Sequence, residues 1–267
     1  MSSSFEDRLT GRFGRPLRHL AEVASTNAEA LEWLASDPPA PEGAVVVADR
    51  QTAGRGRWGR SWVSSPEASL VFSLVLRPAW ASEYLGLMTV AAGLACAQGL
   101  IALTGIPARL KWPNDVLVHD RKLAGILTET RVSGHEVDGI VVGIGVNLDL
   151  PAELPPEIAE RATGLAVEAR RAGSEPPERA VVLAAILQSL EAVYDAIGDD
   201  GGRAEVRAHA AELMDLLGHE VDLRFPDGRT ERVTATRLLE DGSLEVETSA
   251  GPSPVHVAEV ERVLVDP

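Results

Sequence analysis

Apolar residues recur along the chain with two periods, one typical of strands and one typical of helices. Alternating or β-branched runs predict strands at 16–23, 43–51, 68–78, 121–132 and 138–148. Helical spacing predicts helices at 28–36, within 84–108, at 176–198 and at 201–218. The stretch 108–120 is extended but interrupted by Pro113, and 153–173 is polar and broken by proline before it becomes helical. Strands that alternate with helices indicate an α/β domain.

After Gly218 the pattern changes to short strands that are joined by Asp-Gly turns, as in RFPDGRT and LLEDGSL. This change predicts a small, barrel-like β domain that follows the α/β domain. We therefore expect an α/β domain over residues 1–217 and a C-terminal β domain over 218–267.

The segment 84–108 carries no charged residue and is long enough to raise the question of a membrane span. Alanine and glycine supply much of its length, Gln98 lies inside it, and no Lys/Arg cluster flanks it, so a buried helix is the better interpretation. The N-terminal residues lack the apolar region of a secretory signal, and the single cysteine, Cys96, fits a reducing compartment. We expect a cytoplasmic protein without a membrane partner.

The net charge of −15 disfavours binding to a long polyanion, with one local exception. Residues 50–66 carry four arginines and no acidic residue. A short, positive, glycine-rich segment in an acidic protein suits a small anionic ligand better than a duplex. The six histidines are scattered and show no zinc-site spacing.

The sequence GRGRWGR at 54–60 contains the G-x-G-x-x-G pattern of a dinucleotide-binding turn. Such a turn needs a helix directly after the glycines, whereas the residues that follow predict a second strand. A Walker loop is absent as well. Binding of single-stranded nucleic acid stays open, as does a mobile exposed loop, although Trp58 and Trp62 are unusual in so polar a segment.

Lysine is rare in this chain, because only Lys111 and Lys122 occur among 25 basic residues. Both lie next to short motifs, KWPNDV (111–116) and KLAGILTE (122–129). Together with QTAGRGRWGRSW (51–62), AEVASTN (21–27) and GIGVNL (143–148), they closely resemble biotin protein ligases, the biotin–[acetyl-CoA-carboxylase] ligase family. The resemblance covers most of residues 16–150, and the order of five motifs makes it specific.

The resemblance implies a mixed-sheet catalytic domain related to class II aminoacyl-tRNA synthetases, followed by an SH3-like barrel. It implies an enzyme that uses ATP and Mg²⁺ to form biotinyl-5′-AMP and then transfers biotin to one lysine of a biotin carboxyl carrier protein domain. The residue types fit this chemistry, because cations must neutralise the biotin carboxylate and the α-phosphate as they approach.

The resemblance also assigns residues by position. The biotin-binding residues would be Ser25, Thr26, Asn27, Gln51, Arg55, Gly56, Arg57, Lys122 and Gly125. The ATP- and adenylate-binding residues would be Arg57, Arg60, Trp62, Asn114, Lys122 and Asn147. The catalytic residues would be Lys122, Arg55, Arg57 and Asp115, where Asp115 either orients the acceptor amine or serves Mg²⁺.

Simpler interpretations remain for single residues: Ser25 and Thr26 can be helix caps, and Lys111 can lie with its amine at a strand edge. The chain also departs from the family's pattern, since Ala24 stands where an acid often precedes Ser-Thr-Asn, and Arg262 is only the nearest match to an arginine of the family's C-terminal domain. About fifteen residues precede the first strand, so we expect a ligase that does not bind DNA. We expect this ligase to be a monomer or a weak homodimer. A lipoate-type ligase is the close enzymatic alternative.

Overall fold

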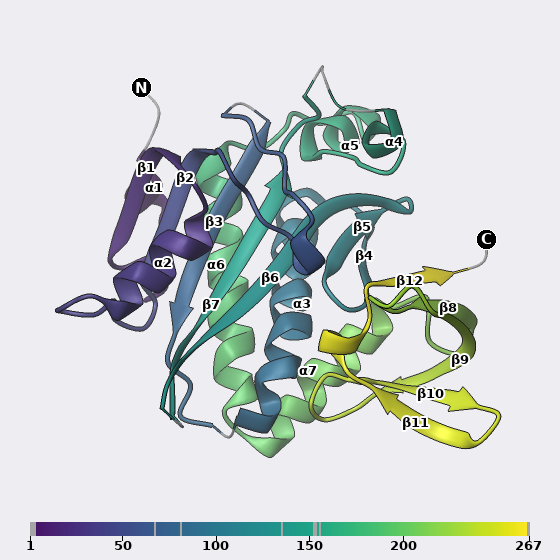
Figure 1. Cartoon of the computed structure of the whole chain (residues 1–267). Helices are drawn as coiled ribbons and strands as arrows, with labels where there is room; N and C mark the ends of the chain where they lie inside the picture. Colours follow the sequence, from purple (N-terminus) through teal and green to yellow (C-terminus); the bar gives the residue numbers. More distant parts are fainter. Residues whose placement is uncertain are drawn as a thin grey trace.

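The computed structural model describes residues 4–66, 68–80, 82–134, 136–151, 154 and 156–265. Its main feature is a seven-stranded sheet in the order β1-β2-β3-β7-β6-β5-β4 (Figure 1). The strands are β1 (Leu17–Val23), β2 (Val45–Gln51), β3 (Ser69–Leu76), β4 (Ala108–Lys111), β5 (Asp115–Val118), β6 (Arg121–Ser133) and β7 (Glu136–Asn147). Among these strands only β1 and β2 pair in parallel, so the sheet is mixed, as the family resemblance implied.

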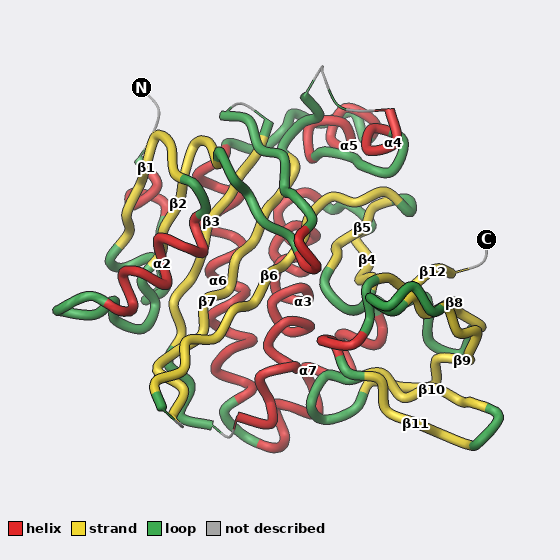
Figure 2. Tube along the Cα trace, in the orientation of Figure 1, coloured by secondary structure: helices red, strands yellow, loops and turns green. Residues whose placement is uncertain are grey.

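Helices cover both faces of this sheet (Figure 2). They are α1 (Phe5–Arg8), α2 (Thr26–Ala35), α3 (Leu85–Thr104), α4 (Pro156–Ala159), α5 (Leu165–Arg171), α6 (Arg179–Ile197) and α7 (Asp200–Glu212). The long helices α3 and α6 pack against each other and, with the sheet, enclose the larger hydrophobic core. The shorter α2 covers the opposite face of β2, β3 and β7 and closes a second, smaller core.

Side chains of a strand alternate between the two faces, and this alternation places the functional positions. In β3, Phe72 and Leu74 belong to the larger core, whereas Val75 belongs to the core under α2. In β7, Ile144 faces the larger core, so Gly143 and Gly145 face the side of α2. The face that carries α2 is therefore the one on which polar and glycine positions gather.

The uncharged segment forms α3, whose burial accounts for its composition. Two described helices, α3 and α6, are long and apolar enough to cross a membrane by length and composition alone. In this structure α3 is largely buried between the sheet and α6, as a core helix of a globular domain. It ends at Gly105, which has the left-handed φ of 71° that favours glycine after a helix. Burial also raises the pKa of the Cys96 thiol to about 12, so that side chain packs as a small apolar residue.

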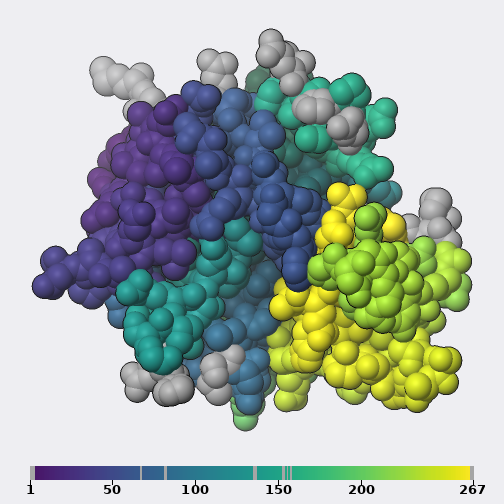
Figure 3. Space-filling model, in the orientation of Figure 1, coloured from purple at the N-terminus to yellow at the C-terminus, as the bar shows by residue number. Residues whose placement is uncertain are grey.

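A second, five-stranded antiparallel sheet follows the helices, in the order β11-β10-β9-β8-β12. Its strands are β8 (Glu220–Arg224), β9 (Thr230–Leu238), β10 (Leu244–Thr248), β11 (Gly251–Val255) and β12 (Arg262–Val265). The β9–β10 turn docks on the first domain, because the buried indole of Trp112 donates a 3.0 Å hydrogen bond to the carbonyl of Gly242. Figure 3 shows the two parts in close surface contact.

The stretch 108–120 is extended on both sides of Pro113, as expected, and forms a hairpin of β4 and β5 with Pro113 in the turn. Three local expectations were inaccurate. The helix predicted over 201–218 ends at Glu212 in α7. Strands β6 and β7 extend further than expected, to Ser133 and from Glu136, and thereby shorten the predicted turn. Helix α1 was not predicted, since four residues are too few to show a helical period.

Candidate active site

Most of the predicted site residues come together on the α2 face of β6 and β7. Strand register places Gly125 opposite Gly145, and Gly143 between Ser73 on β3 and Leu127 on β6. Gly125, Gly143 and Gly145 thus form a strip of backbone without side chains, here called the glycine lane, on which residues from other elements can lie.

The indole ring of Trp62 lies on this glycine lane. A Cβ atom at Gly145 would be 2.4 Å from Trp62 Cε2, and one at Gly125 would be 3.1 Å from Trp62 Cζ3. The Lys122 ammonium lies 5.5 Å from the centre of the same ring. The Trp62 indole nitrogen is buried and has no hydrogen-bond partner among the described residues. A buried donor without a partner at this place is available to a ligand.

The Arg/Gly loop between β2 and β3 is a small hairpin, with Trp62 N–H donating to the Gly54 carbonyl at 2.9 Å and Gly56 N–H to the Arg60 carbonyl at 2.7 Å. The glycines are followed by a single 3₁₀ turn, η1 (Arg57–Gly59), and then by β3. The dinucleotide-binding interpretation therefore fails on structure as it did on sequence. Gly54 is required sterically, because a Cβ atom there would lie 2.4 Å from the Trp62 carbonyl oxygen.

The loop arginines have different partners. Arg55 forms a 3.1 Å ion pair with Glu129 of β6. Arg57 instead reaches the C-terminal β domain, where it donates to the carbonyls of Val257 and, at 2.8 Å, Val260. Arg60 donates to the Glu261 carbonyl at 2.8 Å. The second domain thus holds this loop through its backbone carbonyls.

The pKa of Arg57 is lowered to about 10, mainly by burial and also by the neighbouring positive charge of Arg60, while the charge of Asp115 opposes the shift. The guanidinium is still a cation at neutral pH. Its Nη1 group also lies 3.3 Å from Asn114 Oδ1, so Arg57 links the β domain to the β4–β5 turn.

A polar cluster surrounds the start of α2. Gln51 Oε1 accepts a 2.7 Å hydrogen bond from the Thr26 backbone N–H, and the Asn27 amide donates to Glu129 at 2.7 Å. Ser25 is the N-cap residue, but its hydroxyl makes no capping hydrogen bond. The cap interpretation of these side chains is therefore not supported, because those of Thr26 and Asn27 turn toward the sheet.

Lys122 lies at the start of β6, and its Nζ atom is 2.6 Å from Asp115 Oδ1 on the neighbouring strand. That oxygen has no aligned hydrogen-bond donor among the described residues, so the contact is a charge pair. The Lys122 backbone is clamped as well, since its N–H donates to the Arg161 carbonyl at 2.7 Å. Asn147 Nδ2 donates to the carbonyls of Lys122, at 3.2 Å, and Thr163, at 3.0 Å. The Asn147 amide thus holds the Lys122 backbone.

Four further residues belong to this region although they were not assigned from the sequence. The Lys111 side chain is half-buried, its amine makes no hydrogen bond or close ion pair in the described chain, and burial lowers its pKa. The Nε atom of Arg262, on β12, is buried without a hydrogen-bond partner among the described residues. The rarity of lysine was a signal for Lys111. Ser73 and Glu129 contact the cluster at α2. Glu129 ends the KLAGILTE motif, whereas no local pattern distinguished Ser73.

The described residues contain no group of three or more His, Cys, Asp or Glu side chains that could hold a metal ion. Mg²⁺ commonly needs only one or two carboxylates, because substrate phosphates supply its other ligands. The single carboxylate of Asp115 fits a magnesium ion that arrives with a nucleotide.

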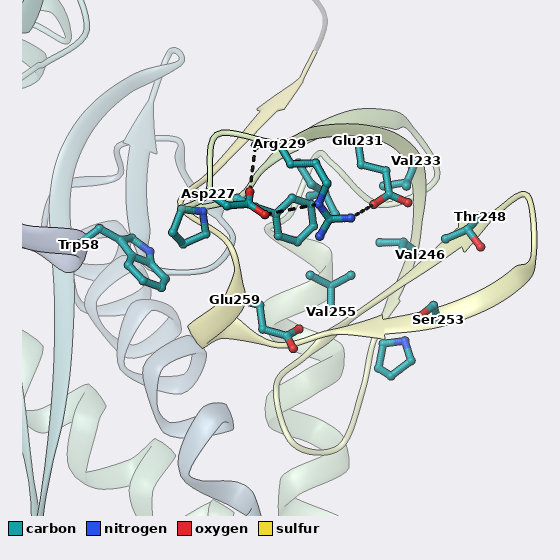
Figure 4. A pocket seen from close by; sticks show the side chains of 14 residues that line it. Trp58, Asp227, Arg229, Glu231, Val233, Val246, Thr248, Ser253, Val255 and Glu259 are labelled. Carbon is teal, nitrogen blue, oxygen red and sulfur yellow. Dashed lines mark hydrogen bonds and ion pairs between the residues drawn. The ribbon is translucent and has the colours of Figure 1, made fainter.

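A groove of about 520 Å³ lies on the β domain and is bordered by Trp58 (Figure 4). Val233, Val246 and Val255 line it, and Arg229 lies 3.9 Å from the ring centre of Phe225. It contains none of the predicted catalytic residues, so we place the site on the glycine lane.

Comparison with known proteins agrees with this geometry. Residues 21–147 match the model of the biotin/lipoate A/B protein ligase family. The biotin–[acetyl-CoA-carboxylase] ligase of Paracoccus denitrificans is 36% identical over 251 residues, which cover 90% of this chain and 98% of that protein. The bifunctional ligase/repressor BirA of Bacillus subtilis is 32% identical over 248 residues, covering 90% and 72%.

Solved structures give the same result. The biotin protein ligase of Aquifex aeolicus, in complex with biotin and ATP, superposes with a TM-score of 0.77 at 32% identity, covering 94% of this chain and 99% of that one. The biotin protein ligase of Leishmania major, in complex with biotinyl-5-AMP, has a TM-score of 0.64 at 26% identity, covering 90% and 98%.

Proposed function

The chain belongs to the biotin/lipoate A/B protein ligase family, and from this membership we infer its reaction. It is a biotin–[acetyl-CoA-carboxylase] ligase that activates biotin with ATP as biotinyl-5′-AMP and transfers the biotinyl group to a lysine of a carrier protein. The observation that carries this conclusion is the convergence of the five sequence motifs on the face of the glycine lane, where Lys122 and Trp62 meet.

In the first step a carboxylate oxygen of biotin attacks the α-phosphorus of ATP, a new O–P bond forms, and pyrophosphate leaves. Both reactants are anions, so the step needs fixed positive charge where they meet. We assign this role to Lys122, Arg55 and Arg57, of which Lys122 is a compact charge and the arginines are planar donors. Arg55 must exchange its Glu129 partner for the ligand.

The nucleotide would lie over the lane. Trp62 offers a ring face and a free indole N–H, and Asn114 and Asn147 lie at its two ends in our assignment. Arg60, Lys111 and Arg262 supply further positive charge toward the phosphates. When bound, Mg²⁺ would neutralise the leaving pyrophosphate, with Asp115 as its protein carboxylate.

In the second step the amine of the acceptor lysine attacks the carbonyl carbon of the mixed anhydride, the C–O bond to AMP breaks, and AMP leaves. The amine must first lose a proton, because its ordinary pKa is about 10.4. Asp115 is the candidate that orients this amine, and magnesium binding is its alternative role. The water-exposed anhydride would hydrolyse, so closure of the Arg/Gly loop protects it.

The test is biotin-dependent exchange of labelled pyrophosphate into ATP, followed by labelling of a biotin carboxyl carrier domain. Wild-type protein should catalyse both reactions, and Lys122→Ala should lose exchange while it keeps its fold. Absence of both reactions in the wild type would overturn the assignment. Lipoate offered in competition separates a lipoate-type ligase, which would prefer it, from the biotin ligase proposed here.

We also propose that the protein works in the cytoplasm as a monomer or weak homodimer and binds neither DNA nor membranes. The net charge of −15 supports the absence of DNA and membrane binding, because it repels nucleic acids and anionic lipid surfaces. Retention on immobilised duplex DNA at low salt would contradict the proposal.

A further inference from the structure

A buried chain of hydrogen bonds connects Glu129 on β6 with Gln51 on β2, through residues that face the start of α2. Asn27 lies at its centre, above Gly143, where a Cβ atom would be only 2.1 Å from Asn27 Oδ1. Ser73 is fully buried on one side of Asn27, and Glu129 lies on the other. The register of the strands aligns Ser73, Gly143 and Leu127 in one row beneath this amide.

The orientation of the Asn27 amide follows from its neighbours. Glu129 is paired with Arg55 and, as a carboxylate, can only accept a hydrogen bond. The Leu127 carbonyl is likewise an acceptor. Asn27 Nδ2 donates to Glu129 at 2.7 Å and to Leu127 at 3.1 Å, which uses both of its hydrogens. The amide oxygen must therefore face Ser73, which lies 2.5 Å away.

This orientation determines where the next proton lies. A hydroxyl has one hydrogen, and the Asn27 oxygen cannot donate, so the Ser73 hydroxyl must donate to Asn27. The Ser73 and Thr26 hydroxyl oxygens lie 2.8 Å apart, closer than the 3.2 Å between the Thr26 hydroxyl and Gln51 Oε1, so the Thr26 hydroxyl donates to Ser73 and not to Gln51. Consequently the Thr26 oxygen keeps its lone pairs free as an acceptor.

At the other end, Gln51 Oε1 is occupied by the Thr26 backbone N–H at 2.7 Å, and Gln51 Nε2 has no partner in the described chain. The cluster thus presents an acceptor, Thr26 Oγ1, beside a donor, Gln51 Nε2. A cyclic urea presents the complementary pair, an N–H beside a carbonyl oxygen.

We propose that Ser73 and Glu129 are positioning residues for biotin, which lock the Asn27 amide and so make the Thr26 hydroxyl an acceptor for a ureido N–H. The inference rests on the proposed biotin ligase function. Neither residue needs to touch biotin, because each acts through Asn27. The Asn27 side chain itself is fully used within the protein, so its part is to transmit this orientation.

The experiment measures the Kd of biotin by calorimetry and the KM values of biotin and ATP by pyrophosphate exchange. In Ser73→Ala the Thr26 hydroxyl can turn its proton to Gln51 Oε1, 3.2 Å away, so that its lone pairs no longer point where the ureido N–H would lie. We expect the Kd of biotin to rise about tenfold, as for the loss of one hydrogen bond. The KM of ATP at saturating biotin should change less than about twofold. Glu129→Gln should also raise the Kd of biotin. The glutamine amide can turn an N–H group toward Asn27, and the Asn27 amide is then free to reverse its orientation.

Thr128→Val is the matched control, since the buried Thr128 hydroxyl on β6 has no hydrogen-bond partner in the described chain and should leave the Kd unchanged. In a double-mutant cycle, Ser73→Ala should add little to Thr26→Val, because both variants act on biotin through the Thr26 hydroxyl. An unchanged Kd in Ser73→Ala, equal losses for biotin and ATP, or full additivity with Thr26→Val would each overturn the proposal. Failure of the wild type to bind biotin would instead overturn the proposed function on which it rests.

Discussion

The contact between Trp62 and the glycine lane gives the sharpest prediction, because it rests on close contacts between named atoms. A methyl group added by Gly145→Ala would lie 2.4 Å from Trp62 Cε2 and 2.6 Å from Cζ2. Carbon atoms in contact prefer about 3.5 Å, so the indole must retreat by roughly 1 Å. Overpacking of this kind costs about 1–3 kcal/mol of the free energy of unfolding.

The same displacement should affect adenylate formation more than stability. A group misplaced by about 1 Å at a reacting centre can reduce the rate by on the order of a hundredfold. We therefore expect Gly145→Ala to lower kcat/KM for ATP in pyrophosphate exchange by between tenfold and a hundredfold, with a fold that remains native by circular dichroism and a modest loss in urea unfolding.

Two further variants test whether the Trp62 ring causes the loss of activity that is expected in Gly145→Ala. Gly93→Ala in α3 is the control, because a Cβ atom there would meet its nearest neighbour at an ordinary 3.4 Å, and this variant should keep full activity. In a Trp62→Ala background the clash has no partner, so Gly145→Ala should then cost little. If Gly145→Ala costs as much without Trp62 as with it, the steric argument is refuted.

Three other changes test single contacts of the fold, two between the two parts of the chain and one within the first part. Arg57→Met removes the donor to two carbonyls of the β domain, so the Arg/Gly loop should be cut faster by limited proteolysis and the KM of ATP should rise about tenfold. Trp112→Phe leaves the Gly242 carbonyl without its donor, and urea unfolding should show a loss of about 1–3 kcal/mol. Hydrogen bonding from Arg12 lowers the pKa of Asp195 below 3.8, so its stabilisation is present above that pH and lost as the pH falls through the lowered value. Asp195→Asn should thus cost under about 1 kcal/mol at pH 7, and the difference from wild type should vanish in acid unfolding.

Local sequence patterns were sufficient for the α/β class, the buried character of α3 and the change to short strands after Gly218, whereas the mixed sheet was implied by the family resemblance. They were sufficient because the period of apolar residues reports which side of an element is buried, and every strand that was expected in the first domain has a counterpart in the sheet. The motifs assigned Lys122 and the Arg/Gly loop to the same reaction, because charge, glycine content and residue order are properties of the sequence itself.

Only the tertiary structure decided which atoms meet. That Gly125 and Gly145 lie opposite each other under Trp62 depends on strand register, and that Arg57 is held by carbonyls of residues 257 and 260 depends on how the two domains dock. Ser73 resembles any serine in a strand until its neighbours Gly143 and Asn27 are brought beside it. The sequence determined which groups the chain carries and on which face each lies, whereas long-range packing determined their partners, because hydrogen bonds and steric contacts depend on distances in space.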